Sequence, residues 1–293
     1  METILCNLCG AHSDREIFRD RGGRFRAVIC ERCTLIYLNP RLSATQYSDY
    51  YINEYQKNRH SITTYEAAVD RLIKKNSYEK KKQLLPLLEK YIDNNSSVLE
   101  YGSGWGTLLR LIKDTFGCRV LGIEISALAV EVSRKFYGVP TESESLEQYI
   151  GKNLGQKSDC VIMYHVLEHM LDPLATLTQI KGILSPNGKL FVAVPNMAAP
   201  DEDISKFFRV EHCYYFSPET LGKILNKAGF EIVEMKTTAR DLQVVVSLLA
   251  KEKSVMDEKK YSVDYFFRVV RMKTTLEKMK NFLRPIKKII WNR

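Results

Sequence analysis

The chain contains 293 residues, of which 45% are hydrophobic and 27% are charged, and its formal net charge at pH 7 is +9. Residues 251–293 hold 13 lysines and arginines against 5 acids, so this segment carries +8 and residues 1–250 carry +1. A nearly neutral body argues against a nucleic-acid partner, which requires several cations on one face. No apolar run reaches the length of a membrane span, and the first residues do not resemble a signal peptide. We therefore expect a cytoplasmic protein.

Two Cys-x-x-Cys pairs, Cys6 with Cys9 and Cys30 with Cys33, are separated by 20 residues. Pairs at this spacing are typical of a structural zinc site, and a reducing compartment favours metal ligands over disulfides. Four thiolates complete the tetrahedral shell of zinc and leave no open position for catalysis. The sequence thus predicts a zinc ribbon over residues 1–42 that holds one structural Zn²⁺.

The rest of the chain is predicted to contain a helical connector, an α/β domain and a tail. Residues 43–95 form the connector, which Ser43 is expected to cap. From residue 96 to 250 strand and helix patterns alternate, which predicts a mostly parallel sheet. Strands are expected near 97–101, 119–125, 159–165 and 188–196, with an antiparallel pair near 230–238 and 242–250.

Polar residues followed by proline mark two helix starts in this domain. Asp172 precedes Pro173, and Ser217 precedes Pro218, so each pair supplies a capping side chain and a proline for the first turn. Residues 197–210 are polar and have no clear period, which predicts a loop over the substrate.

A glycine-rich turn is the centre of the predicted binding site. The first strand of the domain places Glu100 before glycines at alternate positions, and an amphipathic helical pattern follows. Glycines allow a ligand to approach the backbone, and a helix N-terminus offers free N–H groups. Glu124 lies at the end of the next strand, about 20–25 residues past the glycines, where a carboxylate can accept hydrogen bonds from both ribose hydroxyls of a nucleoside.

Three segments resemble known methyltransferases. The glycine turn resembles motif I of class I S-adenosylmethionine (SAM) methyltransferases. Residues 28–41 resemble the zinc-binding segment that precedes many bacterial sugar and small-molecule methyltransferases. Residues 165–173 resemble the motif after the fourth strand in the group related to ubiquinone O-methyltransferases. This resemblance implies a Rossmann-like, seven-stranded sheet with SAM as cofactor, and we expect cofactor contacts at Glu100, Gly102, Ser103, Gly104, Gly106, Glu124, Ile125, Ser145, Leu146, Tyr164 and His165.

His212 is the leading candidate for a general base that removes a proton from the acceptor. Glu211 precedes it and can orient the imidazole, and Tyr214 follows; this segment resembles one that carries catalytic residues in sugar C-methyltransferases. His169, beside Glu168, is a second candidate. That pair either caps and packs, or holds the acceptor or a divalent metal, as in quinol O-methyltransferases.

The expected function is SAM-dependent methyl transfer, at oxygen or carbon, to a small-molecule or carrier-linked sugar acceptor. The resemblance suggests a place in surface polysaccharide or secondary-metabolite biosynthesis. Two alternatives stay open. One is a ribosomal RNA methyltransferase that uses the zinc ribbon to hold RNA, and the other is a noncatalytic SAM-binding scaffold.

The tail is predicted to form a basic amphipathic helix, in which Pro285 produces a kink or a break. Three partners for its apolar stripe stay open: the protein's own domain, a second copy in a homodimer, or an anionic membrane surface, which would place the protein at the inner face of the membrane. The stripe has steps of three and four residues and consists of Phe266, Val269, Met272, Leu276, Met279, Leu283, Ile286 and Ile290.

Overall fold

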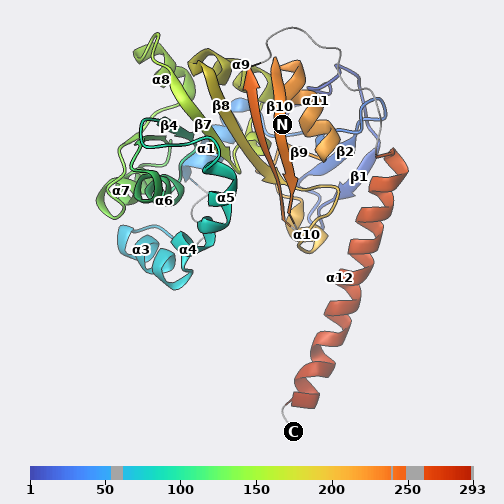
Figure 1. The fold of residues 1–293 in the computed structure, drawn as a ribbon. Coiled ribbons are helices and arrows are strands. Elements are labelled where there is room, and N and C mark those ends of the chain that lie inside the picture. Colours follow the sequence, from blue (N-terminus) through green and yellow to red (C-terminus); the bar gives the residue numbers. More distant parts are fainter. Residues whose placement is uncertain (54–61, 239, 249–260, 292–293) are drawn as a thin grey trace.

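The computed structural model describes residues 1–53, 62–238, 240–248 and 261–291. Its largest element is a seven-stranded sheet in the order β10-β11-β8-β7-β4-β5-β6 (Figure 1). Strands β4 to β8 run parallel, while β11 pairs antiparallel with β8 and with β10. The predicted Rossmann-like α/β fold is confirmed. The strands are Ser97–Tyr101 (β4), Arg119–Ile123 (β5), Thr141–Glu142 (β6), Ser158–Tyr164 (β7), Leu184–Pro195 (β8), Phe230–Thr237 (β10) and Asp241–Leu248 (β11).

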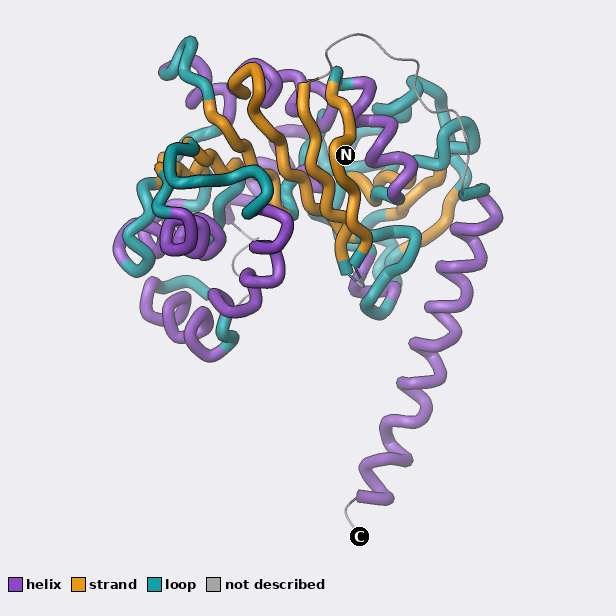
Figure 2. The backbone as a smooth tube through the Cα atoms, in the orientation of Figure 1, coloured by secondary structure: helices purple, strands orange, loops and turns teal. Residues whose placement is uncertain are grey.

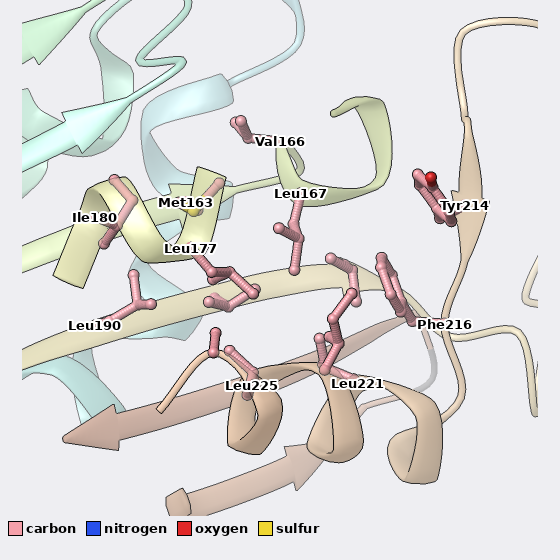
Figure 3. Close-up of a cluster of buried hydrophobic side chains, with 14 of the residues drawn as sticks. Met163, Val166, Leu167, Leu177, Ile180, Leu190, Tyr214, Phe216, Leu221 and Leu225 are labelled. Carbon is pink, nitrogen blue, oxygen red and sulfur yellow. The ribbon is translucent and has the colours of Figure 1, made fainter. Parts of the chain in front are cut away.

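Successive strand residues enter hydrophobic cores on opposite faces of this sheet, as the period of two requires. Val98, Cys160 and Ile162 pack on one face with α3 (Tyr65–Lys74), α5 (Leu85–Leu88), α6 (Thr107–Phe116) and α7 (Ala127–Lys135). Leu99 and Met163 pack on the other with α8 (Leu146–Lys152), α9 (Pro173–Ile183) and α11 (Pro218–Lys227). Figure 3 shows this second core, in which Leu177 and Leu221 approach the sheet from two helices. Each fully buried side chain of this size stabilises the fold by about 1.5–3 kcal/mol.

The predicted helix caps are present. Asp172 Oδ1 accepts the backbone N–H of Ala175 at 3.0 Å. Ser217 and Thr220 form a reciprocal capping box at the start of α11. Such caps satisfy backbone donors that have no partner within the helix.

The N-terminal segment forms a second, four-stranded sheet in the order β1-β2-β3-β9. The first three strands are Glu16–Arg19, Arg26–Ile29 and Ile36–Leu38, as expected for a ribbon. The fourth, β9 (Tyr214–Tyr215), comes from the chain beyond residue 210. The predicted boundary at residue 42 therefore separates segments that share hydrogen bonds in space.

The connector is helical in the residues that the structure describes. It contains α1 (Ala44–Asn53), α3, α4 (Ser77–Lys81), the 3₁₀ turn η1 (Lys82–Leu84) and α5. Ser43 caps α1, because its Oγ accepts the Gln46 N–H at 3.4 Å and Gln46 Oε1 accepts the Ser43 N–H at 3.1 Å. The predicted loop over residues 197–210 is not wholly irregular: it contains the short helix α10 (Ile204–Phe207), because Phe207 and Phe208 are buried in a third core against the ribbon sheet.

The C-terminal helix α12 (Val263–Trp291) begins at this third core and then extends away from the body (Figures 1 and 2). It continues through Pro285, so the predicted break does not occur; a proline removes one hydrogen bond of the helix while the flanking turns keep theirs. Among the described residues, no helix combines the length and the apolar composition needed to cross a bilayer.

Candidate active site

A cavity of about 770 Å³ opens at the carboxyl ends of β4, β5 and β7, where open α/β sheets bind ligands. Its volume lies within the usual range for a small-molecule site. The residues that line it come from α1, the glycine turn, the end of β5 and the turn after β7. They are Ala44, Tyr47, Ser48, Tyr51, Ile62, Thr63, Tyr101, Gly102, Gly104, Trp105, Ile123, Glu124, Ile125, Ser126, Ala127, Leu128, Ser145, His165, Val166, His169 and Met170.

The three alternate glycines of the turn all have left-handed backbone conformations, with φ of 70° at Gly102, 53° at Gly104 and 78° at Gly106. A Cβ at Gly106 would lie 2.1 Å from Ser133 Oγ, and one at Gly102 would lie 2.5 Å from Val166 Cγ2. Among the described residues, no atom lies within 4 Å of the position that a Cβ at Gly104 would take. Gly102 and Gly106 therefore allow close packing of the turn, and Gly104 leaves open space for a ligand against the backbone.

Glu124 lies at the end of β5 and closes this side of the cavity. Its Oε2 accepts the Gly104 N–H at 2.8 Å, and its Oε1 accepts the Ser126 N–H at 2.8 Å. Burial raises the pKa of this carboxyl group. The glycine turn and Glu124, which the sequence predicted separately, thus form one wall, together with Ile125 and Ser145.

Five predicted cofactor residues lie outside the cavity lining. Ser103 and Gly106 are in the turn, but their positions face Gly122 and Ser133. Leu146 is the first residue of α8 and its side chain is fully buried in the core, while the preceding Ser145 caps that helix. Glu100 and Tyr164 belong to a group behind the cavity that also contains Lys81 and Asp241.

This buried group contains Lys81 from the connector. Burial raises the pKa of Glu100 to about 8 and lowers the pKa of Lys81 to about 8, because each charged form loses its hydration. Lys81 Nζ lies 3.2 Å from the centre of the Tyr164 ring, and the Tyr164 hydroxyl donates to Asp241 Oδ2 at 3.5 Å. The alternation along β4 directs Glu100 away from the cavity, and this group supports the sheet under the glycine turn.

His165 is held between two buried carboxylates at the cavity wall. Its Nδ1 lies 3.3 Å from Glu168 Oε1, and its Nε2 lies 3.2 Å from Asp241 Oδ1. Its φ of 57° is in the left-handed region, which is rare for a residue with a Cβ. Burial opposes protonation of the ring, but the two carboxylates outweigh it and raise the pKa of His165.

We expect the free energy of unfolding to fall as the pH rises through the raised pKa of His165. The contribution is complete below the unfolded-state pKa, about 6.5, and disappears once the folded-state ring loses its proton. Glu100 and Glu124 also have raised pKa values and add a decrease of the same sign. Urea unfolding at about pH 6 and pH 8 measures this free energy in the parent and in His165→Asn, and the difference between the two proteins gives the contribution of the histidine. His12→Asn is the control, because His12 is exposed. Equal pH dependence in parent and His165→Asn would contradict the ion triad.

His169 reaches the cavity from the 3₁₀ turn η2 (Leu167–His169). Its Nδ1 is 2.8 Å from the carbonyl oxygen of Glu211 and 2.7 Å from the Tyr51 hydroxyl. A carbonyl can only accept, so Nδ1 carries the proton, and in the neutral ring Nε2, which lies 3.9 Å from Glu168 Oε1, is the nitrogen that accepts one. His169 therefore has the tautomer that a general base requires.

The segment of residues 211–214 lies directly behind His169. The rings of His212 and His169 meet edge to face with centroids 4.8 Å apart, but His212 is 5% exposed and does not line the cavity. Glu211 orients His169 through its backbone carbonyl, and its carboxylate accepts the Tyr50 hydroxyl at 3.4 Å. Tyr214 is buried in β9, where its hydroxyl donates to the Leu171 carbonyl at 3.1 Å.

The structure adds three residues that the sequence prediction did not include. Tyr47 and Tyr51 line the cavity from α1, and the Tyr47 hydroxyl lies 2.6 Å from the His169 carbonyl and 2.7 Å from the Glu211 carbonyl. Their spacing of four residues, which places both on one helix face, was the available signal. Asp241, at the start of β11, gave no local signal, because only the sheet brings it to His165.

The four predicted zinc ligands lie together at the edge of the ribbon, with every sulfur atom within 4.8 Å of the others. The Cys6 and Cys33 sulfurs are 3.5 Å apart, as are those of Cys9 and Cys30. Zn–S bonds of about 2.3 Å place tetrahedral sulfurs about 3.8 Å apart. Both pairs fold alike, since the Gly10 N–H donates to the Cys6 carbonyl and the Thr34 N–H donates to the Cys30 carbonyl. The cluster fits zinc.

Comparison with known proteins gives a family and several relatives. The ubiquinone biosynthesis O-methyltransferase of Histophilus somni is 29% identical over 128 residues, which cover 39% of this chain and 53% of that protein. That of Aromatoleum aromaticum is 27% identical over 174 residues, which cover 52% and 74%. The chain thus spans about half the length of the first relative. The solved structure of magnesium protoporphyrin IX methyltransferase from Synechocystis with bound SAM is 17% identical, covers 72% of this chain and 100% of that one, and has a TM-score of 0.49.

The family match extends over residues 65–235 and is described as a methyltransferase domain. It includes the glycine turn, Glu124 and the segment from His165 to His169, whereas the ribbon and α1 lie outside it. Because the match covers more than half of the chain, the protein belongs to the methyltransferase domain family, in the class I, SAM-dependent group.

Proposed function

We propose that this protein transfers the methyl group of SAM to a hydroxyl oxygen of a small, uncharged ring-bearing acceptor. The observation that carries the proposal is the single cavity that joins the glycine turn and Glu124 to His169. The first part suits a nucleoside cofactor, and the second offers a base next to aromatic side chains. A noncatalytic scaffold has no need of the second part.

The cofactor half uses Gly104, Glu124 and Ser145. The open side of Gly104 admits a ligand against the backbone, and the Glu124 carboxylate is placed to accept hydrogen bonds from the ribose hydroxyls. Ile125 and Ser145 flank the position where the adenine ring would follow. Bound SAM supplies a carbon that is already activated, because its sulfonium leaves without a proton.

We expect Glu124→Gln to weaken SAM binding by roughly 10- to 100-fold, because one acceptor of the charged carboxylate is lost. Isothermal titration of the purified protein with SAM and with S-adenosylhomocysteine measures the effect. Glu142→Gln is the matched control, since Glu142 lies on the neighbouring strand and is half exposed. Unchanged affinity in Glu124→Gln would contradict the ribose role and leave the cofactor half without its main contact.

The acceptor half aligns a hydroxyl and removes its proton. With SAM bound, the acceptor oxygen would form a bond to the methyl carbon while the C–S bond breaks and its electron pair stays on sulfur. We assign His169 Nε2 as the base that takes the hydroxyl proton, and Tyr51 and the Glu211 carbonyl as the groups that hold the ring. Proximity and orientation supply most of the remaining rate enhancement.

Two features support an uncharged ring as the acceptor. Of the described residues, those that line the cavity include no lysine or arginine, so none of them would pair with a phosphate. Tyr47, Tyr51, Tyr101 and Trp105 provide aromatic faces. The relatives carry the name ubiquinone biosynthesis O-methyltransferase, which adds weight to oxygen as the methylated atom. A sugar ring, free or attached to a carrier, offers the same hydroxyl chemistry.

Release of S-adenosylhomocysteine tests the acceptor class, because every methyl transfer from SAM yields this product whatever the acceptor. Catechols and simple glycosides are the two probe sets, and a short ribosomal RNA fragment is the third. Turnover with either small-molecule set supports the proposal. Turnover with RNA alone would overturn it in favour of an RNA methyltransferase.

We further propose that Cys6, Cys9, Cys30 and Cys33 hold one structural Zn²⁺. Four thiolates at the observed spacing repel one another unless a cation lies between them. The metal would fix both ends of the ribbon, with no role in the chemistry of methyl transfer.

A divalent cation is a second candidate role for the cluster of Glu168, His169 and His212, whose ligand atoms all lie within 4.8 Å. A carboxylate and two imidazoles form a donor set that suits transition metals. Of the three residues only His169 lines the cavity, so such a cation would lie behind the cavity wall and would supply a Lewis acid beside the acceptor half.

A further inference from the structure

Helix α12 is attached to the body by one face of its first turns. Phe266 and Val270 enter the third core, and the Glu277 carboxylate accepts hydrogen bonds from the Ser205 hydroxyl and backbone N–H. Lys280 Nζ lies 3.2 Å from Asp203 Oδ1. Beyond this point the helix leaves the body in Figures 1 and 2.

Beside this face, the predicted apolar stripe continues from Phe266 and Val269 to side chains that are exposed to solvent. Met272, Leu276 and Met279 are 56%, 45% and 55% exposed, and their spacing of four and three residues places them in one row. The described part of the body buries the start of the predicted stripe, at Phe266 and Val269, and leaves these three side chains about half exposed. The protein's own domain, one of the three partners that the sequence left open, therefore covers the start of the stripe but not Met272, Leu276 and Met279.

In the sequence, the same row continues through Leu283, Ile286 and Ile290, and the chain becomes strongly basic. Residues 278–293 contain six cations and no acid, and Trp291 lies near the end. Lysine and arginine beside an apolar row, with an aromatic residue at the end, are typical of helices that lie in a membrane interface.

We propose that α12 binds an anionic lipid surface, with the apolar row towards the acyl chains and the flanking cations at the headgroups. Charge decides between this partner and a second copy. Lys273 and Lys287 flank the row, and residues 278–293 provide no carboxylate to pair with their cations in a coiled coil. Anionic headgroups supply the missing negative charge.

Co-sedimentation of the full chain with vesicles tests this proposal. We expect binding to phosphatidylcholine vesicles that contain phosphatidylglycerol, little binding to phosphatidylcholine alone, and a decrease at high salt. Lys287→Glu with Lys288→Glu should weaken binding by roughly 30-fold or more, because each cation near the surface contributes about a fivefold factor. Leu276→Glu with Met279→Glu should abolish binding through the apolar row.

Lys251→Glu with Lys253→Glu is the matched control, since it makes the same change in net charge outside the helix. If this control weakened binding as much as the helix variants, attraction would depend on total charge and the proposal would fail. Failure to bind anionic vesicles would also overturn it. Light scattering on the same samples tests the alternative that the row binds a second copy. If the parent were a dimer that did not bind vesicles, and Leu276→Glu with Met279→Glu converted it to a monomer, the row would be assigned to a second copy.

Discussion

Cys33→Ser is expected to remove zinc and to abolish methyl transfer, while SAM still binds. Structural zinc in small ribbons contributes roughly 10–16 kcal/mol of apparent binding free energy at neutral pH, so the ribbon is expected to unfold without the metal. The cofactor half of the cavity belongs to β4, β5 and their turns, which lie in the other sheet. Zinc loss should therefore separate the two halves of the site.

The connection from the ribbon to the acceptor half is a short strand. Tyr37 of β3 pairs with Tyr214 of β9, and Ile36 pairs with Tyr215. Three residues before Tyr214 lies Glu211, whose carbonyl holds the Nδ1 proton of His169. Unfolding of the ribbon would release β9 and, with it, the group that fixes the tautomer of the base. A misplaced base accounts for a loss of roughly 10²–10⁴-fold in rate.

Three measurements check this prediction. Metal analysis should give one zinc per chain in the parent and none in Cys33→Ser. Titration with SAM should give similar affinities, and S-adenosylhomocysteine release should be lost in the variant alone. Cys118→Ser is the control, since Cys118 is buried but lies outside the four-cysteine cluster. Loss of SAM binding together with zinc would show that the whole domain depends on the ribbon, and normal turnover without zinc would refute the connection.

The sequence was most informative where local chemistry decides the structure. The glycines at 102, 104 and 106 need left-handed conformations that follow directly from the tight turn between β4 and α6. Helix starts at Asp172 and Ser217 were readable because each cap is a local contact. Each Cys-x-x-Cys pair was readable because a single turn fixes the spacing within the pair.

Contacts between distant segments were not accessible in the same way. Glu211 was predicted to orient the imidazole of the adjacent His212, whereas its backbone carbonyl contacts His169, 42 residues earlier in the chain. Asp241 reaches His165 only because β11 pairs with β8 in the sheet. Likewise, no periodicity in residues 211–217 indicated that two of them would join the ribbon. Such contacts depend on strand order, which local patterns do not encode.

His169→Ala is expected to lower the turnover rate by roughly 10²–10⁴-fold without weakening SAM binding, because it removes the only histidine nitrogen that we assign to the acceptor proton. His212 was the candidate from the sequence, but its ring lies behind His169 and does not line the cavity. His212→Gln should therefore have a smaller effect, through loss of packing against His169. A larger effect for His212→Gln than for His169→Ala would restore His212 as the base.

Tyr51→Phe separates positioning from proton transfer at the same centre. The phenol is 2.7 Å from His169 Nδ1, and Phe keeps the ring on the cavity wall while it removes that contact. We expect a moderate fall in turnover, with the pH dependence of kcat/KM retained, because His169 still titrates. In His169→Ala the inflection due to the base should disappear. If turnover instead required added Mg²⁺ or Mn²⁺ and was abolished in Glu168→Gln, the cluster would act as a metal site, and the proton would leave by another route.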